Sequence, residues 1–321
     1  MILILLLLII IFSMVLIRSA DMTVIALKKL AGKGGVIGLS AIIVALGTSF
    51  PELFVGITSA LEGEPTLSLG VALGSNVANI ALIGAGAAII IGKVTITEAI
   101  LKKIVWISLV CGILPYILLL DGNLNRVDGI IMIFVYIAYL LSFFKHFHLR
   151  ALDESQKGLT LTKLIRKVEH FTEDKWKSLA GVFIGISLML FSADTIVKYS
   201  SIFAERIHIP VFVIGLFILA IGTSLPEFAF SLRSLKDKEP EMYIGNLLGS
   251  IVANTTLVVG LSVLIKPIYS LTFSRYLLPG GAFIFVYLLF YFFVRTKKRL
   301  DRWEAWVLLA IYIAFFLIEL M

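Results

Sequence analysis

The sequence is poor in charge and in cysteine. Only 15% of its 321 residues are charged and 60% are hydrophobic, which gives a mean hydropathy of +1.03. This composition excludes an ordinary soluble protein, so we expect an integral membrane protein. The single cysteine, Cys111, excludes an internal disulfide and any cluster of cysteines around zinc or iron.

Long apolar runs account for this composition. Residues 34–61 contain one ionisable side chain, Glu52, and residues 65–92 contain none. Each run is longer than the about 20 residues that cross the hydrocarbon core of a bilayer. The same reasoning predicts eight more membrane helices, and thus an all-α protein with ten transmembrane helices. The eight lie at residues 2–30, 98–120, 125–146, 176–200, 208–235, 242–265, 272–295 and 303–321.

An internal repeat divides the chain into two halves. Shifted by 175 residues, positions 45–80 align with positions 220–255 and 16 of the 36 pairs are identical. We therefore predict a first five-helix repeat at 1–146, a loop at 147–175 and a second five-helix repeat at 176–321. Because five is an odd number, the two copies must enter the membrane from opposite sides, so the repeats are expected to be inverted.

The positive charge of the chain predicts its orientation. The net charge is +7, but the basic residues lie in short breaks between apolar runs, which does not indicate a nucleic-acid partner. If the loops are numbered from the one after the first predicted helix, 23 of the 28 lysines and arginines lie in or beside the odd-numbered loops. The positive-inside rule then predicts extracellular termini and a cytoplasmic 147–175 loop. The plasma membrane is the simplest location for this multi-pass protein. No obligate protein partner is evident.

Two glutamates are the only carboxylates of their spans. Glu52 and Glu227 occupy equivalent positions of the two repeats, and a charge in a membrane helix costs at least about 2.5–3.5 kcal/mol. Inverted copies would bring the two side chains together near the middle of the bilayer. Two adjacent carboxylates repel each other unless a cation or protons neutralise them, which indicates a cation site.

The residues around these glutamates offer oxygen atoms. Pro51 and Pro226 cannot donate to the preceding turn, so carbonyl oxygens of Gly47 and Gly222 are freed. Hydroxyl and amide side chains lie one turn away or on the next helix. They are Thr48, Ser49, Ser75 and Asn79 in the first repeat, and Thr223, Ser224, Ser250 and Asn254 in the second. A site built from oxygen alone favours a hard cation such as Ca²⁺ over zinc or copper.

These motifs resemble those of the sodium/calcium exchanger-like members of the calcium:cation antiporter superfamily. Members carry Gly-Thr-Ser-x-Pro-Glu on one helix and Gly-Ser-x-x-x-Asn/Asp on the next, and both copies here match. The resemblance implies ten helices in inverted repeats and alternating-access exchange of Ca²⁺, as substrate, for H⁺ or Na⁺, without a cofactor. It also implies that the backbone carbonyls of Ala45 and Ala220 coordinate the ion. The metal ion would be bound as well by Glu52, Glu227, Thr48 and Thr223.

One position departs from the family pattern. Sodium-coupled relatives commonly carry aspartate where this chain has Asn254. With only two carboxylates, one Ca²⁺ or two protons balance the charge equally well. We therefore expect exchange of Ca²⁺ for H⁺. Exchange for Na⁺ stays open, because an amide oxygen also binds Na⁺.

Other classes fit the sequence less well. A passive cation channel also uses intramembrane carboxylates, but an inverted repeat with an odd number of helices argues against one. An intramembrane hydrolase would need a base near Ser49 or Ser224, and neither serine has a neighbouring histidine or lysine in its span. We therefore expect no enzymatic activity. A simple packing kink explains one copy of the motif but not two with a glutamate in each.

Overall fold

The computed structural model describes residues 2–31, 47–96, 98–154 and 173–320. Ala45 and most of the predicted 147–175 loop lie outside the described residues.

Helices account for nearly all of the described chain. In the first half these are α1 (Ile2–Ala31), α3 (Phe50–Leu61), α4 (Pro65–Ala78), η1 (Asn79–Gly84), α5 (Ala85–Ile91), α6 (Glu98–Leu118), η2 (Leu119–Asp121) and α7 (Arg126–Glu154). In the second half they are α9 (Glu173–Ile207), α10 (Val211–Ile214), η3 (Gly215–Leu219), α11 (Ala220–Thr223), α12 (Leu225–Lys236), α13 (Pro240–Val252), η4 (Ala253–Val258), α14 (Val259–Ile265), α15 (Phe273–Lys297) and α16 (Arg302–Glu319).

Within the described residues, seven helical stretches are long and apolar enough to cross a membrane. They agree with seven of the ten predicted spans. The remaining three are the predicted 34–61 span, described only from residue 47, and the helices α7 and α16, which form where helices were predicted. The chain is thus a helical membrane protein, and the count of ten spans stays a prediction.

Two short strands depart from the all-α prediction. Residues Lys93–Thr95 (β1) pair antiparallel with residues Arg299–Asp301 (β2), and Val94 stands opposite Leu300. The strands follow α5 and precede α16, so two helix ends emerge side by side and their free backbone groups pair. Hydrophobic periodicity could not reveal so short a pairing.

The helices break at the two prolines, as the sequence predicts. The second residue of α3 is Pro51 and the second of α12 is Pro226, and each helix begins directly after a serine with a non-helical backbone. A proline ring fits the first turn of a helix because its missing N–H is not needed there. The result is a new helix N-terminus in each half, with a glutamate in its first turn.

Three π-helical segments were not predicted. Segments η1 and η4 begin at or next to Asn79 and Asn254, and η3 interrupts the helix before α11. A π-helical turn contains an extra residue and leaves the regular hydrogen-bond ladder, and such turns are frequent at functional sites. The equivalent placement of η1 and η4 fits the internal repeat.

The two halves share further local features. The α3–α4–η1–α5 order recurs as α12–α13–η4–α14. The ladder formed by Lys93–Thr95 also has a counterpart 175 residues later, where Ile268 pairs with Leu124. These two pairings lie at opposite ends of α15, because Ile268 precedes that helix and β2 follows it. The fold therefore consists of two related repeats.

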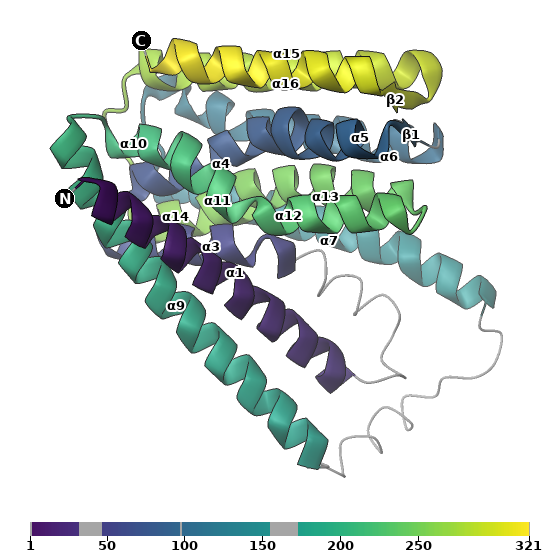
Figure 1. The fold of residues 1–321 in the computed structure, drawn as a ribbon, viewed down its shortest axis with the longest axis horizontal. Coiled ribbons are helices and arrows are strands. Elements are labelled where there is room, and N and C mark those ends of the chain that lie inside the picture. Colours follow the sequence, from purple (N-terminus) through teal and green to yellow (C-terminus); the bar gives the residue numbers. More distant parts are fainter. Residues whose placement is uncertain (1, 32–46, 97, 155–172, 321) are drawn as a thin grey trace.

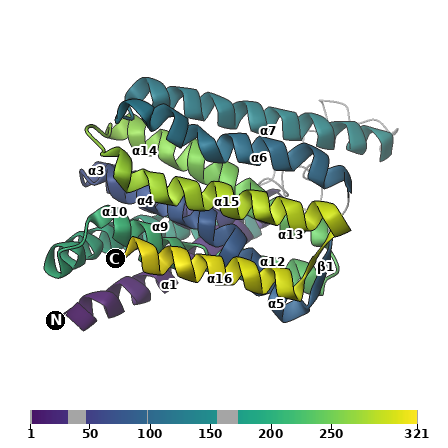
Figure 2. The ribbon, with the colours of Figure 1, turned by 90° about the horizontal axis from the view of Figure 1, so that it is seen from above.

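Figures 1 and 2 show how the elements are arranged. Most helices run roughly parallel, whereas α1 and α9 lie side by side and cross the others obliquely (Figure 1). Both termini lie at one end of the molecule and the β1–β2 ladder lies at the other. Helices α6 and α7 form one flank and α16 lies toward the opposite one (Figure 2).

Close helix contacts depend on glycine at two places. A Cβ atom on Gly74 would lie 1.9 Å from the carbonyl oxygen of Leu216, and one on Gly70 would lie 2.2 Å from that of Phe212. In the oblique pair, a Cβ on Gly185 would lie 2.1 Å from Oγ1 of Thr23. Small residues four apart let membrane helices approach each other closely. The first contact joins α4 to the helix that leads to α11.

Candidate cation-binding site

The site centres on Glu52 and Glu227, which are both fully buried. Each lies in the first turn of its helix, α3 or α12. The two carboxyl groups are near enough to interact electrostatically. The structure therefore brings together the two glutamates that the repeat predicted to converge.

The two halves interlock around the glutamates. Helix α3 packs against η4, the segment that carries Asn254, and α12 packs against η1, the segment that begins with Asn79. Helix α11 packs against both α3 and α4. The hydroxyl groups of Thr223 and Ser224 consequently lie beside the Glu52 carboxyl group. Residues of the second repeat thus lie beside Glu52, and the helix that carries Glu227 packs against a segment of the first repeat.

Many polar atoms at this place have no hydrogen bond. Within the described residues, neither carboxylate oxygen of Glu52 has a hydrogen bond, and Oε2 of Glu227 has none either. The same holds for further buried side-chain oxygens at the site. These are Oγ of Ser49, Ser75 and Ser224, and Oδ1 of Asn79 and Asn254. Buried polar atoms are normally paired, so this concentration requires an explanation.

Other predicted residues have partners. Ser250 donates a hydrogen bond of 3.4 Å from Oγ to Oε1 of Glu227, and Thr223 donates one of 3.0 Å to the carbonyl oxygen of Leu219. The carbonyl oxygen of Ala220 accepts a 3.2 Å bond from the Ser224 N–H and keeps a second lone pair. Thr48 is only partly buried. Ala45 cannot be placed, because it lies outside the described residues.

Two buried amides were missed by the sequence analysis. Asn76 accepts a 3.5 Å hydrogen bond at Oδ1 from the amide of Asn254. Asn246 donates from Nδ2 to the carbonyl oxygen of Glu227 over 3.3 Å. Both are polar residues inside apolar spans, which was the available signal, but neither has a polar counterpart in the other repeat. A comparison of the repeats therefore passed over them.

The chemistry of the site suits a hard cation. Two carboxylates and a set of hydroxyl, amide and carbonyl oxygens match the six to eight oxygen ligands, at roughly 2.3–2.6 Å, that Ca²⁺ takes. Among the described residues, no three His, Cys, Asp or Glu side chains gather as a metal-binding group. Because only two of the nearby oxygen donors are anionic groups, a bound divalent ion would be neutralised but not over-compensated.

Comparisons with known proteins agree with this arrangement. The family description "Sodium/calcium exchanger protein" matches residues 1–145 and 177–321. The chain is 32% identical over 276 residues to inner membrane protein YrbG of Escherichia coli (strain K12), covering 84% of this chain and 82% of that protein. It is 30% identical over 232 residues to the putative antiporter CaxA of Alkalimonas amylolytica, covering 72% and 70%.

More distant relatives extend the likeness. The chain is 26% identical over 322 residues to the sodium/calcium exchanger MaX1 of Methanosarcina acetivorans, covering 91% of this chain and 90% of that one. Its fold is similar to that of the sodium-calcium exchanger NCX_Mj soaked with Na⁺ and Sr²⁺, with a TM-score of 0.62, 24% identity and 98% of each chain covered. The resemblance found in the motifs is thereby confirmed. The chain belongs to the sodium/calcium exchanger family of calcium/cation antiporters, which are transporters and not enzymes.

Proposed function

We propose that the protein is a secondary active antiporter that exchanges Ca²⁺ for H⁺ at the site between Glu52 and Glu227. The observation that carries this proposal is the set of buried oxygens without hydrogen bonds, above all three of the four carboxylate oxygens. Leaving a buried polar group unpaired costs about 1–3 kcal/mol, and more for a charged group. A cation that binds these oxygens would offset that cost.

The exchange follows from competition for the same two carboxylates. Both are fully buried and close to each other, so the site is stable only when their charge is neutralised. One Ca²⁺ or two protons achieve this equally. Occupancy by Ca²⁺ and by protons is therefore mutually exclusive, and release of one at either membrane face allows the other to bind.

Alternating access would expose this central site to each face in turn. We assign the movement to the oblique helices α1 and α9, which pack along each other where Gly181 and Gly185 face Ala26, Ser19 and Thr23. Glycine contacts of this kind allow two helices to move as one unit. The interlocked helices α3, α4 and α11–α14 would form the body against which the pair slides.

The proposed topology has ten membrane helices in two inverted five-helix repeats. Its support is that equivalent backbone pairings, at Val94 and at Ile268, lie at opposite ends of α15. Both termini lie at one end of the molecule (Figure 1). The distribution of basic residues favours an extracellular location for that end, and we assign the protein to the plasma membrane as the simplest location. No protein partner is required by this scheme.

Sodium is the second candidate counter-ion. Oδ1 of Asn254 has no hydrogen bond within the described residues, and a free amide oxygen is a suitable Na⁺ ligand. The relative MaX1 is a sodium/calcium exchanger by name. Proton exchange remains the first choice, because Asn254 contributes no third negative charge to the site.

Ca²⁺ uptake into proteoliposomes tests the proposal. Purified protein is reconstituted, and uptake is compared under an outward proton gradient, an outward Na⁺ gradient and no gradient, at a fixed membrane potential. Uptake driven by protons alone supports proton exchange. Uptake driven only by Na⁺ replaces it with the second candidate, and uptake that ignores both gradients would mean a channel.

Variants connect the transport to the site. Glu52→Gln should abolish gradient-driven uptake, because one carboxylate cannot neutralise Ca²⁺. The matched control is Glu239→Gln, which changes an exposed carboxylate at the loop before α13. We expect the control to transport like the wild type. Wild-type uptake in the Glu52 variant would refute the assignment of the site.

A further inference from the structure

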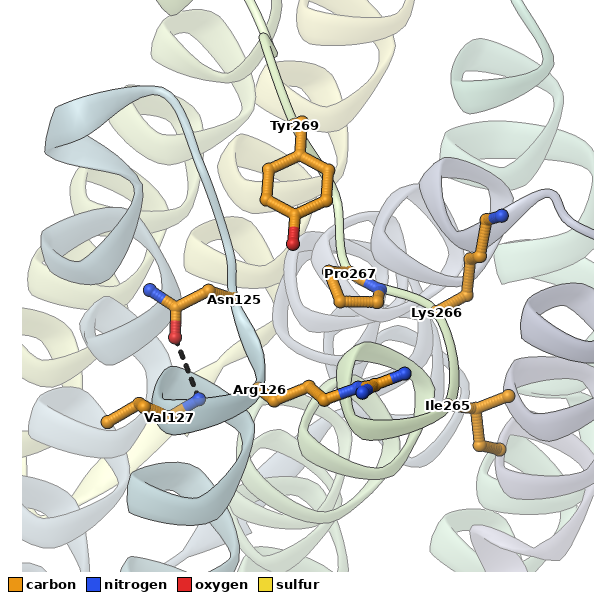
Figure 3. Close-up of a pocket in the computed structure, with 7 residues that line it drawn as sticks. All are labelled: Asn125, Arg126, Val127, Ile265, Lys266, Pro267 and Tyr269. Atoms are coloured by element: carbon orange, nitrogen blue, oxygen red, sulfur yellow. Dashed lines mark hydrogen bonds between the residues drawn. The ribbon is translucent and has the colours of Figure 1, made fainter.

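A pocket of about 500 Å³ lies away from the proposed transport site, at the end of the molecule that carries both termini. It is formed where α7 begins and where the chain leaves α14. Its lining residues are Asn125, Arg126, Val127, Ile265, Lys266, Pro267 and Tyr269. Figure 3 shows the Arg126 side chain reaching from α7 toward the segment at Ile265, while the Tyr269 hydroxyl points into the space beside Asn125.

The pocket is positively charged. Arg126 and Lys266 line it, and within the part of the chain that the structure describes neither makes an ion pair. The nearby carboxylate of Asp128 is nearly buried and accepts a 2.8 Å hydrogen bond from the backbone N–H of Asn125. Within the described residues, this carboxylate forms no ion pair with Arg126 or Lys266.

The equivalent corner of the other repeat is built differently. There, Lys297 lies 3.4 Å from Asp301 and 3.5 Å from Glu304, and Arg299 lies 3.0 Å from Asp301. Lys297 and Arg299 therefore have anionic partners within the protein. Arg126 and Lys266 have none among the described residues, so both can bind an anion from outside the chain.

The pocket lies at the level of lipid headgroups. The apolar span of α13–α14 ends at Ile265, the residue directly before Lys266. On α7, the residues that follow Arg126 turn apolar side chains outward, with Val127 62% and Phe134 67% exposed. Tyr269 is 67% exposed, and tyrosine is enriched at membrane interfaces. Cations at the rim and an apolar wall below them match a headgroup and its acyl chain.

We propose that this pocket binds the phosphate of an anionic phospholipid. Arg126 and Lys266 would contact the phosphate oxygens, Tyr269 would donate from its hydroxyl, and Val127 and Phe134 would lie along an acyl chain. An anionic headgroup is favoured over phosphatidylcholine, because the choline cation would approach two positive side chains. The site is independent of the transport reaction, and its failure would leave the proposed function untouched.

Native mass spectrometry of the full-length protein tests this assignment. Delipidated protein in detergent is titrated with dioleoyl phosphatidylglycerol, with dioleoyl phosphatidylcholine and with inorganic phosphate. Phosphatidylglycerol should bind to the wild type as a retained adduct. In Arg126→Gln and Lys266→Gln the dissociation constant should rise about fivefold for each charge removed, since a basic residue near anionic lipid contributes about 1 kcal/mol.

Two controls keep the test specific. Arg126→Lys combined with Lys266→Arg retains both charges and should bind like the wild type, which separates lost charge from misfolding. Arg275→Gln removes an exposed cation near the start of α15, outside the pocket, and should change nothing. Three outcomes would each overturn the proposal. Phosphatidylcholine could bind as well as phosphatidylglycerol, or the combined variant Arg126→Gln with Lys266→Gln could bind the lipid like the wild type. In the third outcome, inorganic phosphate displaces the lipid at equal concentration.

Discussion

Replacing Gly74 by alanine tests how the packing of the two repeats determines the geometry of the site. A Cβ atom at this position would lie 1.9 Å from the carbonyl oxygen of Leu216 and 2.6 Å from its carbon. Ordinary contacts of a Cβ begin at 3.4 Å. Helix α4 and the helix containing η3 would therefore have to separate by about 1.5 Å, and backbone atoms cannot yield as a flexible side chain does.

The separation would affect both stability and ion binding. Overpacking a tight contact costs about 1–3 kcal/mol, and a backbone clash belongs at the upper end of that range. Ser75 follows Gly74 directly, and Thr223 lies seven residues, or about two turns, after Leu216. A shift of about 1.5 Å between these elements exceeds the tolerance of Ca²⁺–oxygen distances, which span only roughly 2.3–2.6 Å. Ca²⁺ affinity should therefore fall more than tenfold.

The measurements are the thermal unfolding midpoint in detergent and Ca²⁺ binding by isothermal titration calorimetry. Gly281→Ala is the matched control, because Gly281 is exposed on α15 and a Cβ there meets no atom within 4 Å among the described residues. The control should unfold and bind Ca²⁺ like the wild type. If Gly74→Ala also did so, the close approach of the repeats would not determine the site.

Two further predictions concern charge. Asn254→Asp adds a third carboxylate, so Ca²⁺ should bind about tenfold tighter, which corresponds to about 1.4 kcal/mol, and Ca²⁺ uptake should become dependent on Na⁺. Calorimetry measures the first effect and proteoliposome uptake the second. Unchanged proton-driven uptake would refute the role given to this amide. At Asp301, desolvation acts to raise the pKa, but the hydrogen bond from Lys297 and the charge of Arg299 outweigh it and hold the pKa below 3.8. The stability that Asp301 contributes is thus present above pH 3.8 and is lost as the pH falls through its lower folded-state value. Asp301→Asn should remove this part of the pH dependence of thermal unfolding, and an unaltered pH profile would contradict it.

Much of the fold and the centre of the site follow from the sequence. Apolar runs located the helices because membrane spans are long and contain few charges. The repeat located Glu52 and Glu227 because both copies kept the same motif. The breaks at Pro51 and Pro226 were predictable from the chemistry of proline. These features are local or periodic, so one sequence contains them in full.

Other features depend on contacts between distant segments. The β1–β2 ladder joins Val94 to Leu300, which no local pattern reveals. No apolar periodicity distinguishes the π-helical turns at Asn79 and near Asn254 from the α-helices on either side. The pocket at Arg126 likewise needs two loops far apart in the sequence. Tertiary structure is required to find all three.

The differences between the repeats carry as much chemistry as their likeness. Duplication explains why each half supplies one carboxylate, but symmetry alone would give both carboxylates the same surroundings. Asn76 and Asn246 break the symmetry between the repeats, since the residues at their equivalent positions are Ile251 and Val71. Asn246 donates to the backbone of Glu227, and Asn76 holds the Asn254 amide with its oxygen unpaired. We therefore expect the carboxylate pair to set the charge that the site accepts, and the asparagines around it to influence which counter-ion binds. Selectivity for the counter-ion should therefore respond to these asparagines, whereas Ca²⁺ binding itself requires both glutamates.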